Sequence, residues 1–187
     1  GWKGHLMADA LESYGAISFT EGVTRLGCWV HARRRFVDAG KVLPEGKRGR
    51  AHEALALIGK LYAIEKEARE LSDAERLARR QSQSRAVIDE LRRWLDQVLP
   101  TVPPTSVLGG ALGYLHRQWP RLTRYLARGD LPIDNNPAEN AIRPFVVGRK
   151  AWLFSDTQAG ARASALIYSL VETAKAYMKH ESQTLEA

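Results

Sequence analysis

Oxygen-bearing and cationic side chains are concentrated in residues 131–154, LPIDNNPAENAIRPFVVGRKAWLF. The carboxylates and amides come first and the cations follow, in the order Asp134, Asn135, Asn136, Glu139, Asn140, Arg143, Arg149 and Lys150. Hard divalent cations prefer oxygen ligands, and guanidinium groups bind phosphate oxygens. These residue types therefore predict a site that holds a divalent metal against a phosphate.

The same residues also have the pattern of a helix start. Asn136 can be the N-cap, Pro137 suits the first helical position, and Glu139 can close a capping box. Pro144 is then expected to end the helix after about two turns. A capping carboxylate can also face a cleft, so the cap and the metal site are compatible and both interpretations stay open.

Two further blocks accompany this acidic segment. In residues 4–36 an apolar run ends at Asp9, and a second run closes with CWVHARRRF. Residues 160–175 read GARASALIYSLVETAK. In this order the three blocks resemble the IS66 family of insertion-sequence transposases, which belongs to the DDE class. The resemblance extends over nearly the whole chain, and the combination of blocks is specific.

This resemblance implies an RNase H-like fold in which three carboxylates gather around two divalent cations. Asp9 matches the second catalytic Asp and Glu139 the catalytic Glu. The first catalytic Asp of the family lies upstream of Gly1. Asp9 and Glu139 would therefore hold Mg²⁺ or Mn²⁺ only together with that upstream Asp, and we expect the chain alone to bind no metal. The implied phosphate-binding residues are Arg143, Arg149 and Lys150, and the implied supporting residues are Asn135, Asn136 and Asn140.

The charge balance points towards a polyanionic partner. The chain has 28 Lys and Arg against 21 Asp and Glu, a net charge of +7. Nucleic acid is the first expectation for such a chain, although a merely basic surface is the alternative. A row of arginines spaced by 4, 3 and 4 residues would share one helix face and contact phosphates, or else be solvated. That row is Arg117, Arg121, Arg124 and Arg128.

Cysteine content and hydropathy indicate the compartment. Cys28 is the sole cysteine, so no intrachain disulfide is possible, as in a reducing cytoplasm. Cys28 and His31 form a CxxH pair, but a structural zinc site needs four ligands, so packing is the expected role. No apolar run approaches the roughly 20 residues of a membrane helix, and no signal peptide is visible. We expect a bacterial cytoplasmic protein associated with the nucleoid and not with a membrane.

The hydrophobic periodicity predicts a mainly α fold with a small β-sheet, an α+β class. Strands are expected at residues 4–8 and 23–30, and a helix at 32–39. A helical hairpin should follow, with Ser72 and Glu75 forming a capping box between its helices. The later expected elements are a helix over 106–128 kinked by Pro120 and closed by Gly129, a strand or extended loop over 146–154, and a helix over 158–178.

The family resemblance divides the chain into three parts. Residues 1–43 would be a partial RNase H-like core that carries the second Asp. Residues 44–128 would be a helical insertion, and residues 129–187 the core segment with the Glu and the final helix. Because the first hairpin of such a core would be missing, the sheet should be small and exposed at one edge.

The leading hypothesis is a C-terminal catalytic-domain fragment of a DDE transposase. The complete enzyme would carry out DNA transposition by metal-dependent phosphodiester cleavage and strand transfer, and the fragment would be inactive alone. The alternative is a non-catalytic DNA-binding or regulatory remnant, and a third possibility is a helical interaction module. The expected partners are duplex DNA at transposon ends and a second copy or a full-length transposase.

Overall fold

The structure, a computed structural model of the 187-residue chain, describes residues 3–7, 21–152 and 157–185. The chain forms two compact units, Gly1–Asn135 and Asn136–Ala187, and each is described by itself. Helices dominate both units, and the described residues contain one two-stranded sheet. The prediction of a mainly α fold with a small sheet is confirmed. The RNase H-like character of the core and its three-part division stay predictions.

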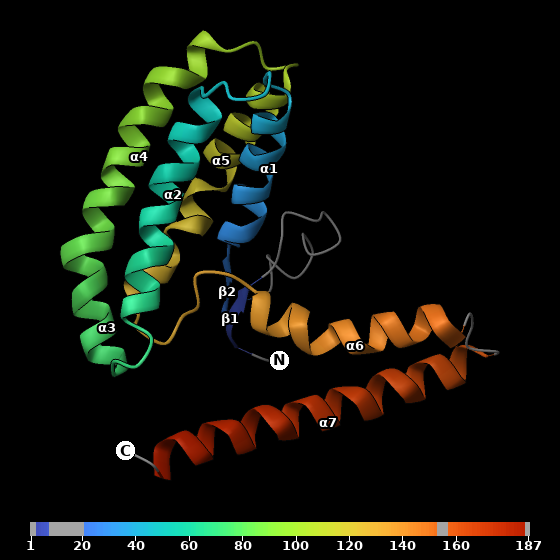
Figure 1. Cartoon of the computed structure of the whole chain (residues 1–187). Helices are drawn as coiled ribbons and strands as arrows, with labels where there is room; N and C mark the ends of the chain where they lie inside the picture. The colour runs from blue at the N-terminus through green and yellow to red at the C-terminus, as the bar shows by residue number, and fades with distance from the viewer. Residues whose placement is uncertain (1–2, 8–20, 153–156, 186–187) are drawn as a thin grey trace. The chain divides into compact units, whose positions relative to one another are not determined.

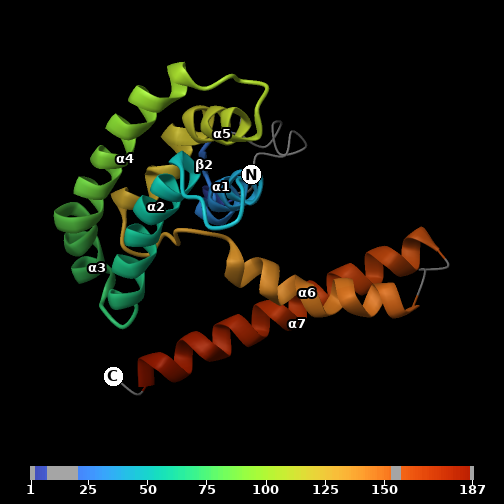
Figure 2. The same cartoon turned by 45° about the horizontal axis from the view of Figure 1, so that its top comes forward.

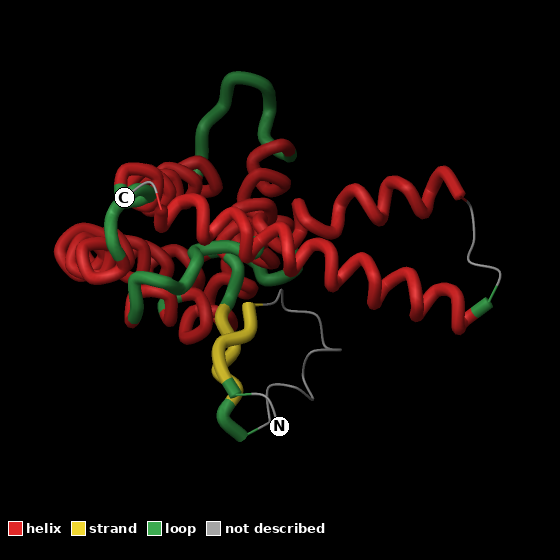
Figure 3. The backbone as a smooth tube through the Cα atoms, turned by 90° about the horizontal axis from the view of Figure 1, so that it is seen from below, coloured by secondary structure: helices red, strands yellow, loops and turns green. Residues whose placement is uncertain are grey.

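The sheet lies in the first unit and is parallel. Strand β1, Gly4–Met7, pairs with β2, Val23–Leu26, so that Met7 lies beside Leu26 at the carboxyl edge (Figure 3). The second strand is shorter than the predicted 23–30. The Gly27 N–H leaves the ladder and donates to the Arg121 carbonyl at 3.0 Å, and a helix then begins at Trp29.

Helices build the core of the first unit. They are α1 Trp29–Lys41, α2 Arg50–Glu67, α3 Asp73–Arg79, α4 Arg85–Val98 and α5 Val107–Leu122. Helix α1 packs against α2 and α5, and α2 also packs against α4 (Figures 1 and 2). The apolar stripes meet there, since the largest fully buried side chains include Trp29, Phe36, Ile58, Leu91 and Leu112.

The predicted capping box opens α3. The Ser72 hydroxyl accepts from the Glu75 N–H at 3.4 Å, and the Glu75 carboxylate accepts from the Ser72 N–H at 3.0 Å. Helix α3 continues through a π-helical turn, Arg80–Ser84, into α4. Arg80 is buried at this turn, and its Nε and Nη2 donate to the two carboxylate oxygens of Glu65 at 2.8 and 2.6 Å.

The region after α5 differs from the prediction of one helix over 106–128. Helix α5 ends at Leu122, a 3-10 turn occupies Arg124–Ala127, and Arg128 is extended. The Thr123 hydroxyl donates to the Trp119 carbonyl at 3.1 Å at this helix end. Gly129 caps no helix: a Cβ there would lie 1.8 Å from the Asp73 carbonyl oxygen, so glycine allows a close approach to α3.

The second unit is a pair of helices, α6 Asn136–Trp152 and α7 Gln158–Leu185, which lie side by side (Figures 1 and 2). The predictions that Pro144 ends the first helix and that 146–154 is extended are wrong, because α6 continues to Trp152. Proline removes its own N–H from the helix ladder and crowds the carbonyl four residues earlier, but a helix can continue past it with a kink. The ring of Phe145 packs 5.0 Å from that of Tyr168 on α7, a contact that favours the continued helix.

Candidate active site

The carboxyl edge of the sheet is where the first predicted catalytic residue should emerge. Strand β1 ends at Met7, and Asp9, two residues later, lies outside the described residues. Met7 is paired with Leu26, and Cys28 follows Leu26 by two residues. Because parallel strands present their carboxyl ends at one edge, the edge that leads to Asp9 also leads to Cys28.

Three consecutive residues before α6 are bound to this edge and to the neighbouring helices. The Ile133 carbonyl accepts from the Trp29 N–H at 3.2 Å. The Tyr62 hydroxyl donates to Asp134 Oδ2 at 2.9 Å, and the Cys28 thiol donates to Asn135 Oδ1 at 2.8 Å. We call residues 133–135 the anchor segment. Its first bond also satisfies one N–H of the first turn of α1, which has no partner within the helix.

The two groups that donate hydrogen bonds to the side chains of the anchor segment, Tyr62 and Cys28, both have a raised pKa. Burial first, and the negative charge of Asp134 second, raise the pKa of the Tyr62 phenol above its ordinary value. Burial raises the pKa of the Cys28 thiol as well. Both groups therefore keep their protons at neutral pH and act as hydrogen-bond donors. Cys28 is buried and serves packing, as the sequence predicted, and not as a reactive thiolate.

Glu139, the second predicted catalytic residue, lies in the first turn of α6 and is half-buried. Asn136 is also half-buried, whereas Asn140 and Arg143 are exposed. The helix begins at Asn136, one residue before the start that the capping interpretation gives. Asn135 is bonded to Cys28 in the first unit. Arg149 and Lys150 belong to α6, but their side chains lie outside the described part of the structure.

The predicted arginine row does not lie on one helix face, because α5 ends before its last two members. Arg117 and Arg121 lie on α5, and Arg121 donates to Gln118 at 3.2 Å. Arg124 donates to the Arg25 carbonyl, and Arg128 pairs with Asp130 at 2.8 Å. The prediction of a shared face assumed that one continuous helix carries all four arginines, but α5 ends at Leu122. A role of these four arginines in DNA binding stays a prediction.

No group of three or more His, Cys, Asp or Glu side chains is placed to hold a metal ion among the described residues, which exclude Asp9. The described helices also include none that is long and apolar enough to cross a bilayer. The metal assignment of Asp9 and Glu139 is therefore not tested by the described geometry.

The two donors of the anchor were missed by the sequence interpretation. The sequence interpretation assigned no role to Tyr62, which packs against the core, and it assigned Cys28 to packing alone. The available signal was chemical: a tyrosine on a buried helix face needs a partner for its hydroxyl. The periodicity contained nothing that identified Asp134, 72 residues away, as that partner.

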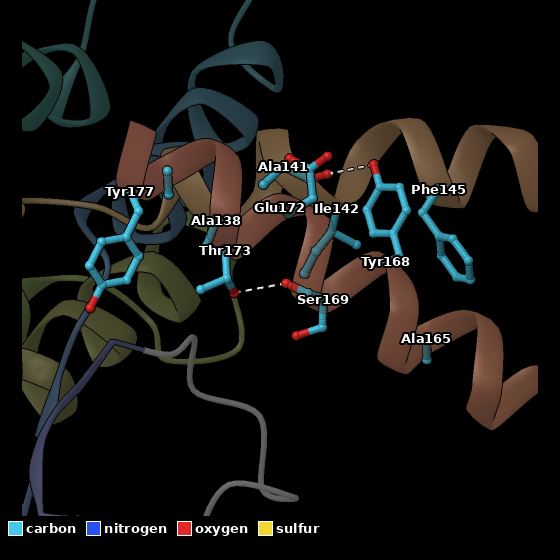
Figure 4. A pocket seen from close by; sticks show the side chains of 11 residues that line it. Ala138, Ala141, Ile142, Phe145, Ala165, Tyr168, Ser169, Glu172, Thr173 and Tyr177 are labelled. Atoms are coloured by element: carbon cyan, nitrogen blue, oxygen red, sulfur yellow. Dashed lines mark hydrogen bonds between the residues drawn. The ribbon is translucent and has the colours of Figure 1, made fainter. Parts of the chain in front are cut away.

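The second unit contains a separate hollow of about 590 Å³ between α6 and α7 (Figure 4). Its lining is mostly apolar and includes Ala138, Ile142, Phe145, Tyr168 and Tyr177. Tyr168 donates to the Ala141 carbonyl at 2.9 Å beside it, as the dashed line in Figure 4 marks. An apolar hollow is unsuited to hold a metal or a phosphate, so we do not assign the candidate active site to it.

Comparison with known proteins gives a family and several relatives. The family model described as "Transposase IS66 family" matches residues 1–163. The uncharacterized proteins y4hP and y4qI of Sinorhizobium fredii are 29% and 30% identical over 94% of this chain. The uncharacterized protein y4jD of the same organism is 28% identical over 93%. The matches cover 33–35% of the relatives, so the chain spans about one third of their length. No solved structure matches the chain.

Proposed function

Because the chain belongs to the IS66 family of transposases, we propose that it is the C-terminal catalytic part of a DDE transposase. The reaction is metal-dependent cleavage of a DNA phosphodiester followed by strand transfer. The relatives are about three times as long as the chain. The activity is therefore proposed for a protein that also contains an upstream part with the first catalytic Asp.

The observation that carries this proposal is the anchor segment at the carboxyl edge of the sheet. Met7 and Leu26 are paired there, Asp9 follows Met7 by two residues, and Cys28 follows Leu26 by two. Cys28 binds Asn135, and Glu139 follows four residues later. Four residues span at most about 14 Å. These short distances along the chain support the proposal that both carboxylates reach one edge, although they are 130 residues apart in sequence.

The donor chemistry fits a hard divalent cation. Carboxylate oxygens suit Mg²⁺ or Mn²⁺, and Glu139 is half-buried in the first turn of its helix. Asp9 and Glu139 would hold the cation together with the upstream Asp. When bound, such ions activate the attacking oxygen and stabilise the leaving oxygen of a phosphodiester. Arg143, Arg149 and Lys150 would bind the DNA phosphates, and Asn136 and Asn140 would orient the Glu.

The test requires an extended protein in which the chain is joined to the residues that precede the matched segment in a relative. We expect this extended protein to nick transposon-end DNA with Mg²⁺ or Mn²⁺, and the 187-residue chain to nick none. Glu139→Gln should abolish nicking, because the amide keeps the shape and loses the charge. Glu70→Gln is the matched control, since this carboxylate is 90% exposed in the first unit. Nicking that survives Glu139→Gln would contradict the assignment.

A non-catalytic DNA-binding role is the second candidate, and the net charge of +7 favours it. The 187-residue chain should then bind duplex DNA weakly and without sequence preference. Its affinity should fall steeply between 50 and 200 mM salt, because each phosphate contact releases counterions. Fluorescence anisotropy with labelled duplexes measures this slope. DNA binding by the extended protein without any nicking would favour this second role over catalysis.

A further inference from the structure

We propose that Asp134 and Asn135 bind no metal, although they belong to the acidic motif. Instead, they hold the acidic motif in position. Tyr62 and Cys28 are the positioning residues that hold them. The proposal rests on the proposed function only where it concerns the active site. The anchor itself is a property of the first unit, so its failure and the failure of the proposed function can be distinguished.

Asp134 is buried and its carboxylate accepts a hydrogen bond. Its side chain belongs to a residue that is 7% exposed, and Oδ2 accepts the Tyr62 hydroxyl at 2.9 Å. A carboxylate that binds a catalytic metal must present its oxygens to a site that DNA and water can reach. Asp134 instead directs one oxygen to a phenol of helix α2. Glu139, by contrast, is half-buried rather than buried.

The bonds of the anchor segment are consecutive and long-range. Residues 133, 134 and 135 are each hydrogen-bonded to another part of the first unit. The partners of Asp134 and Asn135, which are Tyr62 and Cys28, are 72 and 107 residues away in sequence. Pro132 and Pro137 flank the segment and fix their own φ angles. A short segment with restricted ends and three long-range bonds has little freedom. It therefore defines the point in the first unit from which α6 starts.

The chemistry of the donors also supports the proposal. A half-buried tyrosine hydroxyl and a buried thiol can donate a hydrogen bond without carrying charge. Neither donor therefore adds a positive charge to the acidic motif. The acidic motif thus has two parts: residues up to Asn135 are bonded within the first unit, and residues from Asn136 onwards, including Glu139, belong to the helix that begins the second unit.

The first experiment uses the 187-residue chain and measures amide hydrogen exchange at residues 134–139. Tyr62→Phe should speed exchange there roughly 10- to 100-fold, because a hydrogen bond to a charged group is lost. Tyr168→Phe is the matched control, since it removes a hydroxyl that bonds Ala141 in the second unit. It should leave residues 134 and 135 unchanged. Unchanged amide exchange in Tyr62→Phe would contradict the proposal that Tyr62 holds the anchor segment in place.

The second experiment uses conservative rescue in the extended protein. Asp134→Asn keeps an oxygen that accepts the Tyr62 hydroxyl, so nicking should stay within about threefold of the parent protein. Asp134→Leu should slow nicking at least about tenfold, because the half-buried Tyr62 hydroxyl loses its acceptor, while DNA affinity stays the same. Loss of nicking in Asp134→Asn with normal exchange would show that Asp134 is a ligand and would overturn the inference. Nicking that survives Glu139→Gln would refute the proposed function and leave the exchange result standing.

Discussion

Both units contain helices with apolar stripes, but the apolar side chains are buried to different extents in the two units. In the first unit the apolar stripes meet, and Leu91, Leu95 and Leu112 are fully buried. In the second unit, Leu166 and Leu170 of α7 are each 63% exposed. A helical stripe shows that a side chain can be buried, but only an element elsewhere in the chain decides whether it is.

The polar contacts of the two units differ in the distance along the chain between their partners. Arg80 pairs with Glu65 across 15 residues and also donates to the carbonyls of Tyr125 and Arg128. The ion pair Lys175–Glu172 of the second unit joins neighbours on one helix, three residues apart. The first unit is therefore fixed by long-range polar bonds as well as by its core.

Loss of the buried ion pair should have the largest effect. Arg80→Ala leaves the Glu65 carboxylate in a site where it is 13% exposed. We expect the free energy of unfolding to fall by about 3–5 kcal/mol, the range for breaking a buried pair. Urea unfolding followed by tryptophan fluorescence measures it. Lys60→Ala breaks the exposed pair with Glu90, in which the side chains are 53% and 48% exposed, and is the matched control. It should cost less than about 1 kcal/mol.

Matched leucines compare the two units directly. Leu112→Ala in the core of the first unit should lower the free energy of unfolding by about 2–5 kcal/mol, through lost transfer energy and the cavity left behind. Leu170→Ala should change it by no more than about 0.5 kcal/mol, because this side chain is largely exposed. Similar losses in the two variants would show that Leu170 is buried in solution.

The helix caps should give the smallest effects. Ser72→Ala removes the hydroxyl that accepts the Glu75 N–H, and the usual cost is about 1 kcal/mol. Thr157→Ala is the counterpart in the second unit, where the hydroxyl accepts the Gly160 N–H at 3.0 Å.

Acid titration separates these two caps. Hydrogen bonds from the Ser72 hydroxyl and N–H lower the pKa of Glu75 below its ordinary value of 4.5. That contribution to stability is therefore present above the ordinary value and lost as the pH falls through the folded pKa. Unfolding measured against pH in the acid range should show it in the parent chain and in Thr157→Ala. Ser72→Ala should show less of it, and an unchanged pH profile in Ser72→Ala would contradict the capping box.

Local chemistry made much of the fold predictable. Ser72 and Glu75 signalled their helix start, and the apolar stripes of α2, α4 and α5 followed the helical period. Pro144 was misread because a proline rule is local, whereas α6 also has Phe145 packed on α7. The 106–128 helix was too long because nothing in its period marked the end at Leu122.

The site was predictable in its residue types and not in its contacts. The acidic motif predicted Glu139 and the strand end predicted Asp9 as catalytic residues, and both assignments stay predictions. Asp134 and Asn135 were grouped with them. Their bonds to Tyr62 and Cys28 join residues 72 and 107 positions apart. Tertiary proximity of this kind leaves no periodic trace in a single sequence.

Our central proposal is that the carboxylates of Asp9 and Glu139, the two proposed catalytic residues, lie close together at the carboxyl edge of the sheet. A crystal structure of the extended protein grown with Mn²⁺ tests it most directly, through the distance between the carboxyl carbons of Asp9 and Glu139. The account predicts less than about 12 Å, a separation that a pair of metals about 4 Å apart can bridge with a third ligand. A larger separation with the Tyr62–Asp134 and Cys28–Asn135 bonds intact would contradict it.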